Sequence, residues 1–265
     1  MKLKELCNSL EEWAPLAYQE SYDNSGLIVG DLSSELTGVL VSLDCIEEVI
    51  DEAIAKGCNV IVSHHPIVFK GLKTFTGNNY VERTVLKAIK NDIALYAIHT
   101  NLDNIHTGVN KMLADKIGLI NTRVLVPKKE VIKQLVTYAM PADADSIRNA
   151  LFEIGAGALG EYSECSFSVS GSGTFKGSGN SNPVVGEKGI RTCQIEERIE
   201  ILFPAFMESK VISVLKSSHS YEEVAYSVFD ISNENQNVGS GMIGELSVVE
   251  NSLDFLGTLK NNLNA

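Results

Sequence analysis

The chain has 265 residues, of which 44% are hydrophobic and 21% charged, so its composition is that of a folded globular protein and not of a fibrous or disordered one. At this length we expect about two domains, with cores large enough to fold without disulfide bonds. The net charge of −12 argues against nucleic acid and anionic membranes as partners, because the densest basic stretch is only Pro127-Lys128-Lys129.

The cysteines and the N-terminus indicate the compartment. The five cysteines form no C-x-x-C pair, which predicts neither a disulfide framework nor a cysteine zinc site. Glu5, Glu11 and Glu12 fall where a signal peptide would be apolar, and no window approaches the ~18 apolar residues of a membrane span. We therefore expect a cytoplasmic protein.

Residues 1–123 alternate between helix and strand. Apolar spacing predicts helices over 3–13, 46–54, 81–89 and 109–117, and apolar runs predict strands over 39–43, 60–62 and 93–98. This alternation is typical of an α/β domain built on a parallel sheet with right-handed crossovers.

Residues 124–247 contain an internal near-repeat whose two copies begin at Leu135 and Glu200. Each copy runs from a strand through a Pro-Ala pair to a helix, a loop and a second strand, and this doubled βαβ pattern predicts a ferredoxin-like α+β domain. The Gly-, Ser- and Asn-rich stretch 171–189 is expected to be a long flexible loop between the copies. Residues 248–265 end the chain with a predicted short amphipathic helix.

Histidines follow two of the predicted parallel strands. His64 and His65 come after strand 60–62, and His99, with Asp103 four residues later, comes after strand 93–98. The carboxyl ends of parallel strands lie along one edge of a sheet, where ligands bind. We therefore expect these two groups to converge.

The local sequence suggests how the histidines are used. Because Pro66 favours an extended backbone at His65, and neighbouring side chains on an extended chain point to opposite sides, the adjacent histidines should serve two centres more readily than one. A carboxylate such as Asp103 could bridge two metal ions ~3.5–4 Å apart. Imidazole and carboxylate ligands suit zinc, manganese, iron, cobalt or nickel without choosing among them.

Simpler interpretations remain for several residues. A single buried histidine is more often a hydrogen-bonded core residue than a metal ligand. His106 lies in a polar loop and is expected to be solvated, and His219 in a predicted helix-to-strand loop is expected to be structural. Asp23-Asn24 reads equally as a turn, and Asp44 either supports a ligand or caps the following helix.

Three motifs occur in order across residues 1–120: Tyr22-Asp23-Asn24-Ser25-Gly26-Leu27-Ile28-Val29-Gly30, Ser63-His64-His65-Pro66-Ile67-Val68-Phe69, and His99-Thr100-Asn101-Leu102-Asp103 with Gly108-Val109-Asn110. In sequence and spacing they resemble the dinuclear-metal family called GTP cyclohydrolase I type 2, or Nif-three-like. Residues 124–247 resemble the PII/CutA-like domain inserted in its longer members.

The resemblance implies a site and an assembly. It implies that His64, His65 and Asp103 bind two divalent transition-metal ions, and that the chain forms a homohexamer whose metal sites face an internal cavity. Candidates for supporting the ligands or contacting a small-molecule substrate are Asp23, Asn24, Asp44 and His99.

The sequence departs from the family at its C-terminal end. In the family a further segment follows the inserted domain and carries a His-x-x-x-Glu pair that completes the site. No histidine follows His219, and His219 with Glu223 lies inside the region that resembles the inserted domain. We therefore expect residues 248–265 to be the truncated helical start of that segment, and we expect metal binding nearer one ion than two per chain.

Three classes of function fit these features. The first is a metal-dependent hydrolase of unknown substrate, as the resemblance implies. The second is a non-enzymatic metal-binding scaffold. The third is a regulatory protein whose inserted domain senses a small molecule.

Overall fold

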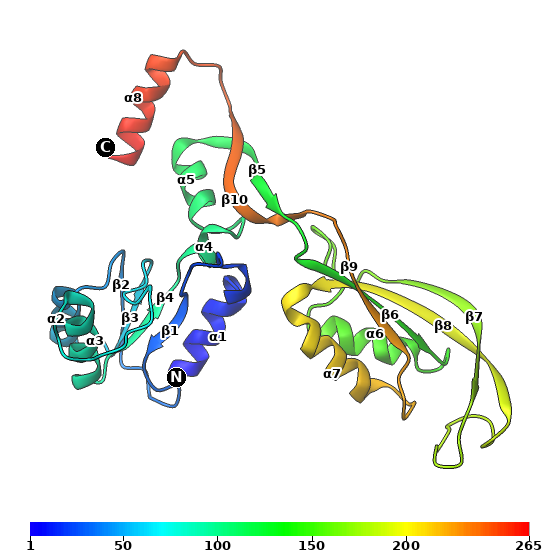
Figure 1. Ribbon diagram of the computed structural model, residues 1–265. Coiled ribbons are helices and arrows are strands. Elements are labelled where there is room, and N and C mark those ends of the chain that lie inside the picture. The colour runs from blue at the N-terminus through cyan, green and yellow to red at the C-terminus, as the bar shows by residue number, and fades with distance from the viewer. Residues whose placement is uncertain (265) are drawn as a thin grey trace. The chain divides into compact units, whose positions relative to one another are not determined.

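The computed structural model describes residues 1–264. In chain order its elements are α1 (Leu3–Trp13), η1 (Leu16–Tyr18), β1 (Gly26–Val29), β2 (Val39–Ser42), α2 (Glu47–Lys56), β3 (Val60–Ser63), α3 (Tyr80–Lys90), β4 (Ala94–Ala97), α4 (Thr100–Asp103), α5 (Val109–Ile117), β5 (Leu119–Lys128), β6 (Ile132–Ala139), α6 (Ala144–Glu153), β7 (Phe167–Lys176), β8 (Arg191–Pro204), η2 (Ala205–Met207), α7 (Glu208–Ser218), β9 (Tyr226–Asp230), β10 (Asn235–Leu246) and α8 (Ser252–Leu263) (Figure 1).

The chain divides into two compact units, unit 1 with residues 1–126 and 237–265 and unit 2 with residues 127–236. Most of β10 therefore belongs to unit 1, although the sequence pattern grouped residues 124–247 together. The physical reason is strand pairing, because β10 forms a two-stranded sheet with β5 and not with the strands of unit 2.

Unit 1 is built on a four-stranded sheet in the order β1-β4-β3-β2. Strands β2, β3 and β4 are parallel and in register, with Val39 opposite Val60 and Val60 opposite Ala94. The predicted helices and parallel strands of this region are confirmed. Strand β1, which the sequence analysis did not predict, pairs antiparallel with β4 and makes the sheet mixed.

The two central strands of this sheet are buried along their whole length. All four residues of β3 and all four of β4 are buried, as expected of strands covered on both faces. Ile61 and Leu95 pack in one core cluster with Ile50 of α2 and Val85 of α3. This rigid centre fixes the ends of β3 and β4.

Strand β10 is fastened to the segment that follows α4. The Gly239 amide donates to Asn104 O at 2.7 Å, and the His106 amide donates to Asn237 O at 3.0 Å.

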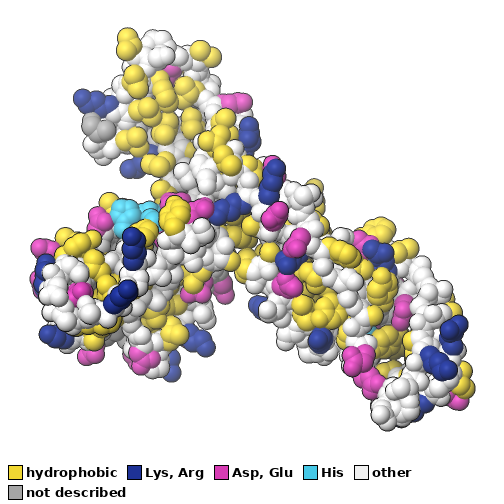
Figure 2. All heavy atoms as spheres, in the orientation of Figure 1, with side chains coloured by type: hydrophobic (Ala, Val, Ile, Leu, Met, Phe, Trp, Pro, Cys, Tyr) yellow, Lys and Arg dark blue, Asp and Glu magenta, His cyan; other side chains and the backbone are white. Residues whose placement is uncertain are grey.

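The predicted C-terminal helix is present as α8, and its leucines leave an apolar face exposed, with Leu253 79% and Leu256 58% exposed. Figure 2 shows hydrophobic side chains gathered over this part of unit 1.

Unit 2 contains an antiparallel sheet in the order β7-β8-β6-β9, with α6 between β6 and β7 and α7 between β8 and β9. The helices pack with the sheet in a core that includes Leu135, Leu151, Ile199, Phe203 and Leu215. The two copies of the sequence repeat thus correspond to β6-α6-β7 and β8-α7-β9. Among the described residues, no helix has both the length and the apolar character needed to cross a bilayer.

The loop predicted over 171–189 begins later in the structure, because Gly171 to Lys176 continue β7 and pair with β8. Gly173 permits this pairing beside a bulky neighbour: a Cβ added there would lie 2.1 Å from Glu196 Oε2. The loop proper is residues 177–190, so glycine-rich composition alone overestimated its length.

Candidate metal centre

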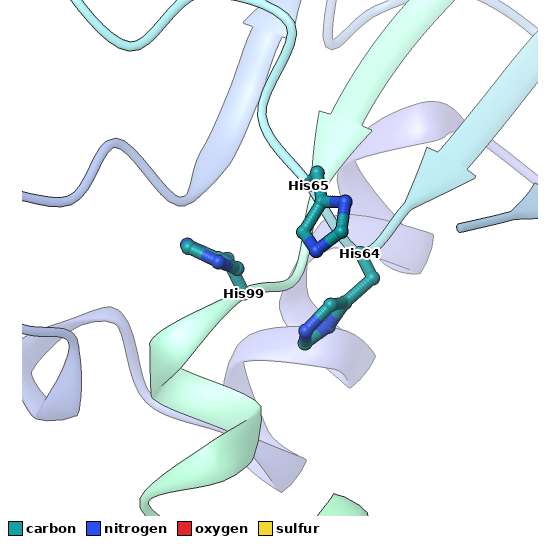
Figure 3. A group of neighbouring side chains, drawn as sticks. All are labelled: His64, His65 and His99. Carbon is teal, nitrogen blue, oxygen red and sulfur yellow. The ribbon is translucent and has the colours of Figure 1, made fainter. Parts of the chain in front are cut away.

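Three histidines gather at the carboxyl ends of β3 and β4. His64 and His65 follow β3, and His99 precedes α4 directly after β4. Each offers one ligand atom, and the three atoms lie within 4.8 Å of one another (Figure 3). The parallel register of β3 and β4 brings these distant residues together, as the topology of the sheet predicted.

The rings of the adjacent histidines lie close together. Their ring centroids are 5.0 Å apart and lie 5.1 and 5.6 Å from the ring of His99. The expectation of opposite directions was wrong because β3 ends at Ser63 and the pair occupies a bend, where the alternation of an extended strand no longer applies.

Each of the three imidazoles is held through its Nδ1 atom. His64 Nδ1 donates to Ile98 O at 3.0 Å, His65 Nδ1 to Asp44 Oδ1 at 2.7 Å, and His99 Nδ1 to Asp23 Oδ1 at 2.9 Å. Carbonyl and carboxylate oxygens only accept, so Nδ1 carries the proton in every case. The Nε2 lone pair of each neutral ring is then left for a ligand, which is the orientation that metal-binding histidines take.

Asp23 is the buried support of His99, and its side chain is fully shielded from solvent. The carboxylate also accepts from Thr100 N at 3.0 Å, from the Thr100 hydroxyl, and from Ser25 Oγ at 3.1 Å. Burial alone would raise the pKa of Asp23, but hydrogen bonds from Thr100, His99 and the Asn24 amide outweigh it and lower the pKa to about 2. Asp23 therefore stays ionised and fixes the tautomer of His99.

Asp44 plays the corresponding part for His65 at the surface. Its side chain is 60% exposed and that of His65 46% exposed. Helix α2 starts after Ile46 and has no side-chain cap, so the carboxylate of Asp44 is used on His65 and not as a helix cap. The histidines thus range from nearly buried His99 to half-exposed His65, and Figure 2 shows histidine side chains reaching the surface of unit 1 beside acidic ones.

Asp103 lies beside the cluster at the end of α4. Its Oδ1 atom is 3.9 Å from His64 Nε2, and its amide donates to His99 O at 3.2 Å. The side chain of Asp103 is 34% exposed, so it faces both the histidines and solvent. The resemblance implies that Asp103 is a ligand and His99 a supporting residue, whereas the three mutually close ligand atoms belong to His64, His65 and His99.

Asn24 has a different place from the histidines. Its side-chain amide donates to Val68 O at 2.7 Å and so holds the loop that follows His65. The aromatic ring of Phe69 in that loop lies 5.6 Å from the ring of His99. Asn24 therefore acts on the wall of the site and Asp23 on a ligand.

Several residues that position α4 were not singled out from the sequence. Asn101 donates to Ala14 O at 2.7 Å and accepts from the His99 amide at 2.9 Å, and Asn110 donates to Asp103 O at 2.8 Å. Gly108 allows the chain to pass close to α4, since a Cβ there would lie 1.8 Å from Leu102 O. All of them belong to the third sequence motif, which was the only signal available for them.

The other two histidines lie outside the cluster. His106 was expected to be solvated and His219 to be structural. His106 is exposed. His219 is buried in unit 2, where its Nε2 donates to Tyr138 O at 2.9 Å and its Nδ1 accepts from the Tyr221 amide at 3.1 Å. Because both ring nitrogens are used, His219 offers no lone pair to a metal.

The whole chain, residues 1–265, matches the model of the Duf34/NIF3 (NGG1p interacting factor 3) family. Relatives named GTP cyclohydrolase 1 type 2 homolog are 39% identical in Halalkalibacterium halodurans, over 89% of this chain and 64% of the relative, and 39% identical in Bacillus subtilis, over 92% and 65%. The chain thus spans slightly less than two thirds of the length of these relatives.

Solved structures agree with these matches. A Bacillus cereus protein related to NIF3 superposes with a TM-score of 0.84 at 39% identity, covering 100% of this chain and 71% of that one. A Staphylococcus aureus protein superposes with a TM-score of 0.72 at 33% identity, covering 100% and 69%. The chain therefore belongs to the Duf34/NIF3 family.

Proposed function

We propose that this chain is a metal-dependent hydrolase of a small molecule, in which His64, His65 and His99, together with Asp103, hold one or two divalent transition-metal ions. Two observations carry the proposal: one ligand atom from each of the three imidazoles lies within 4.8 Å of the others, and each Nδ1 is hydrogen-bonded to an oxygen atom, which leaves the Nε2 lone pair for a ligand. Such support of ligands is the usual construction of a metal centre.

The donor set fits zinc, iron, manganese, cobalt or nickel, since imidazole and carboxylate suit all of them. A bound ion of this kind lowers the pKa of a water molecule and polarises a substrate oxygen. The chain's own residues orient and hold protons around it. Asp23 keeps His99 in one tautomer, and Asp103 places a partly exposed carboxylate where it can complete the ligand set or accept a proton.

We extend the proposal to the rest of the protein. The strand order β7-β8-β6-β9, with one helix after the first strand of each βαβ pair, supports a ferredoxin-like unit of PII/CutA-like type over residues 127–236. Val41 in the edge strand β2 and Leu43 directly after it are exposed and support self-association, for which we propose a homohexamer in the cytoplasm.

Metal content tests the proposal directly. The full chain, purified without added metal, should contain zinc, iron, manganese, cobalt or nickel by elemental analysis. His99→Ala should remove most of it, and the matched control His106→Ala, an exposed histidine of the same unit, should not. Unchanged metal in His99→Ala would overturn the assignment.

Activity is tested separately on metal-loaded protein. The relatives' name makes GTP the first substrate to try, followed by simple phosphate esters and simple amides. Hydrolysis that disappears with a chelator and returns with metal supports a hydrolase. Full metal loading without turnover of any of them would instead favour the metal-binding scaffold.

A further inference from the structure

A cavity of about 540 Å³ lies wholly within unit 2. It is bounded by β7, by the loop 177–190 and by the turn 219–225 that precedes β9. Its volume falls in the range of small-molecule sites, roughly 300–1,000 Å³. The cavity shares no residue with the histidine cluster, so it is a second candidate site with its own chemistry.

The loop that closes the cavity is tied in place by hydrogen bonds. The Gly189 amide donates to Gly177 O at 2.8 Å, which closes the base of the loop. The Asn182 amide donates to Glu222 Oε1 at 2.8 Å, which joins the loop to the turn before β9. Figure 1 shows the connection between β7 and β8 curled back at the end of its hairpin. The loop therefore forms one wall of the cavity that is held in place by hydrogen bonds.

Much of the lining is apolar. Phe175, Pro183, Val184, Val185 and Ala225 contribute hydrocarbon surface, and Tyr138 adds an aromatic ring. Val184 is 54% exposed although it lines this hollow. Burial of such surface by a ligand gains roughly 25 cal/mol per Å², so an apolar ligand body is favoured here.

Glu196 is the polar group around which the cavity is organised. Its Oε1 accepts from the Tyr221 hydroxyl at 2.9 Å, and its Oε2 packs over the backbone of Gly173. The Tyr221 ring is itself fixed against His219, with ring centroids 4.9 Å apart. Within residues 1–264, no donor is bonded to Glu196 Oε2, so one carboxylate oxygen is left to a ligand.

The charged residues of the lining favour a ligand that carries a positive charge. Glu196, Glu222 and Glu223 line the cavity against the single cation Lys176. Asp143 adds negative potential, since it acts on Tyr221 and accepts from Ser220 Oγ at 2.6 Å. A phosphate or carboxylate ligand would meet repulsion, whereas an ammonium group would gain a charge-assisted hydrogen bond.

We propose that this cavity binds a small organic cation, with an aromatic or aliphatic body against Phe175, Val184 and Ala225 and its ammonium group on Glu196. The site stands independently of the metal centre. It assigns unit 2 a ligand class that follows from its own lining residues.

The test uses the full chain and three probes of one shape. These are 2-phenylethylammonium, neutral 2-phenylethanol and anionic 3-phenylpropionate, followed by titration calorimetry and by amide NMR shifts. We expect the cation to bind at least tenfold more tightly than the alcohol, with no measurable binding of the anion, and shifts confined to lining residues. Equal binding of cation and anion would overturn the proposal. So would the absence of cation binding at ligand concentrations on the order of 10 mM.

Matched variants locate the site. Glu196→Gln keeps an acceptor for Tyr221 but removes the charge, and it should weaken cation binding at least tenfold. Val184→Lys places a competing cation on an exposed loop position and should weaken it similarly, which guards against a folding defect at position 196. Glu161→Gln, exposed and outside the lining, is the control and should bind as the parent does. Parent-like binding in both lining variants would place the ligand elsewhere.

Discussion

Replacing Asp23 with asparagine should separate the two tasks of this buried carboxylate, support of the fold and support of His99. Both oxygens of Asp23 accept hydrogen bonds, Oδ1 from His99 and the Asn24 amide, and Oδ2 from Thr100 and Ser25. An asparagine amide must present its NH₂ to one of these sets of donors. If it faces His99, the ring must give up its Nδ1 proton and protonate Nε2, which removes the lone pair that a metal needs.

The magnitude follows from the pKa and from the burial. The pKa of Asp23 is lowered from 3.8 to about 2 because hydrogen-bond donors outweigh the cost of burial. At 1.36 kcal/mol per pKa unit, ionisation contributes roughly 2 kcal/mol to the free energy of unfolding at neutral pH. Because the folded pKa is depressed, this contribution is present above the unfolded pKa near 3.8 and is lost as the pH falls toward 2. Loss of such a ligand support typically costs 10–100-fold in metal affinity, on the order of 1.4–2.7 kcal/mol.

Two measurements check this. Urea unfolding of metal-free Asp23→Asn should show a loss of about 2 kcal/mol at pH 7 that shrinks at low pH, and competition with a chromophoric chelator should show a 10–100-fold weaker affinity for zinc. Asp44→Asn is the matched comparison, since its exposed pair with His65 should contribute only ~0–1 kcal/mol to stability. Parent-like zinc affinity in Asp23→Asn, with the His99 tautomer unchanged by NMR, would refute the reasoning.

Three further predictions concern the site, its loop and unit 2. The double variant His64→Ala/His65→Ala should lose its bound transition metal by elemental analysis yet keep the parent circular dichroism spectrum, because both residues lie in a bend outside the core; metal retained at the parent level would contradict this. The pKa of Glu82 is lowered to about 2 by hydrogen bonds from the amides of the preceding loop, so its stabilisation is present above pH 4.5 and declines toward pH 2. Glu82→Gln should therefore be less stable than the parent at pH 7 in urea titrations, with the difference narrowing on acidification; a difference independent of pH would show that its charge is not involved. Residues 127–236 expressed alone should give a single cooperative thermal transition, since their core is complete within the unit, and a non-cooperative melt would show dependence on unit 1.

The sequence predicted best what depends on local pattern. The helices and buried strands of residues 1–123 follow from apolar spacing, and Gly57 and Gly118 end α2 and α5 in the left-handed conformation that glycine favours. Strand β1 was not predicted because it is only four residues long and starts at Gly26, and glycine is depleted in strands. Strand β10 was not predicted, and its residues were grouped with the inserted region because its partner, β5, lies more than a hundred residues earlier.

The candidate site shows the same division between local and distant information. That His64, His65 and His99 would meet followed from parallel-strand topology, without knowledge of any side-chain position. The resemblance named Asp23 as a candidate for supporting a ligand, but its partner His99 did not follow from the sequence, because their hydrogen bond spans 76 residues and depends on the unpredicted strand β1. The direction of the His64 and His65 rings depends on where β3 stops, and a one-residue difference there reverses a side chain.

The three histidine rings differ in how firmly they are held, because their hydrogen-bond partners are buried to different extents. His99 is held by a fully buried Asp23 that is ionised at neutral pH, and His64 by the carbonyl of Ile98 just after β4, so both rings are fixed before any ion arrives. His65 is held by an exposed Asp44, in a pair that solvent weakens. A first ion should therefore be organised by His99 and His64, with Asp103 beside them, while His65 adjusts to a second ion or to a substrate. On this argument His99→Ala should reduce metal affinity more than His65→Ala does, and the reverse order would show that exposure of the supporting carboxylate does not govern the strength of the site.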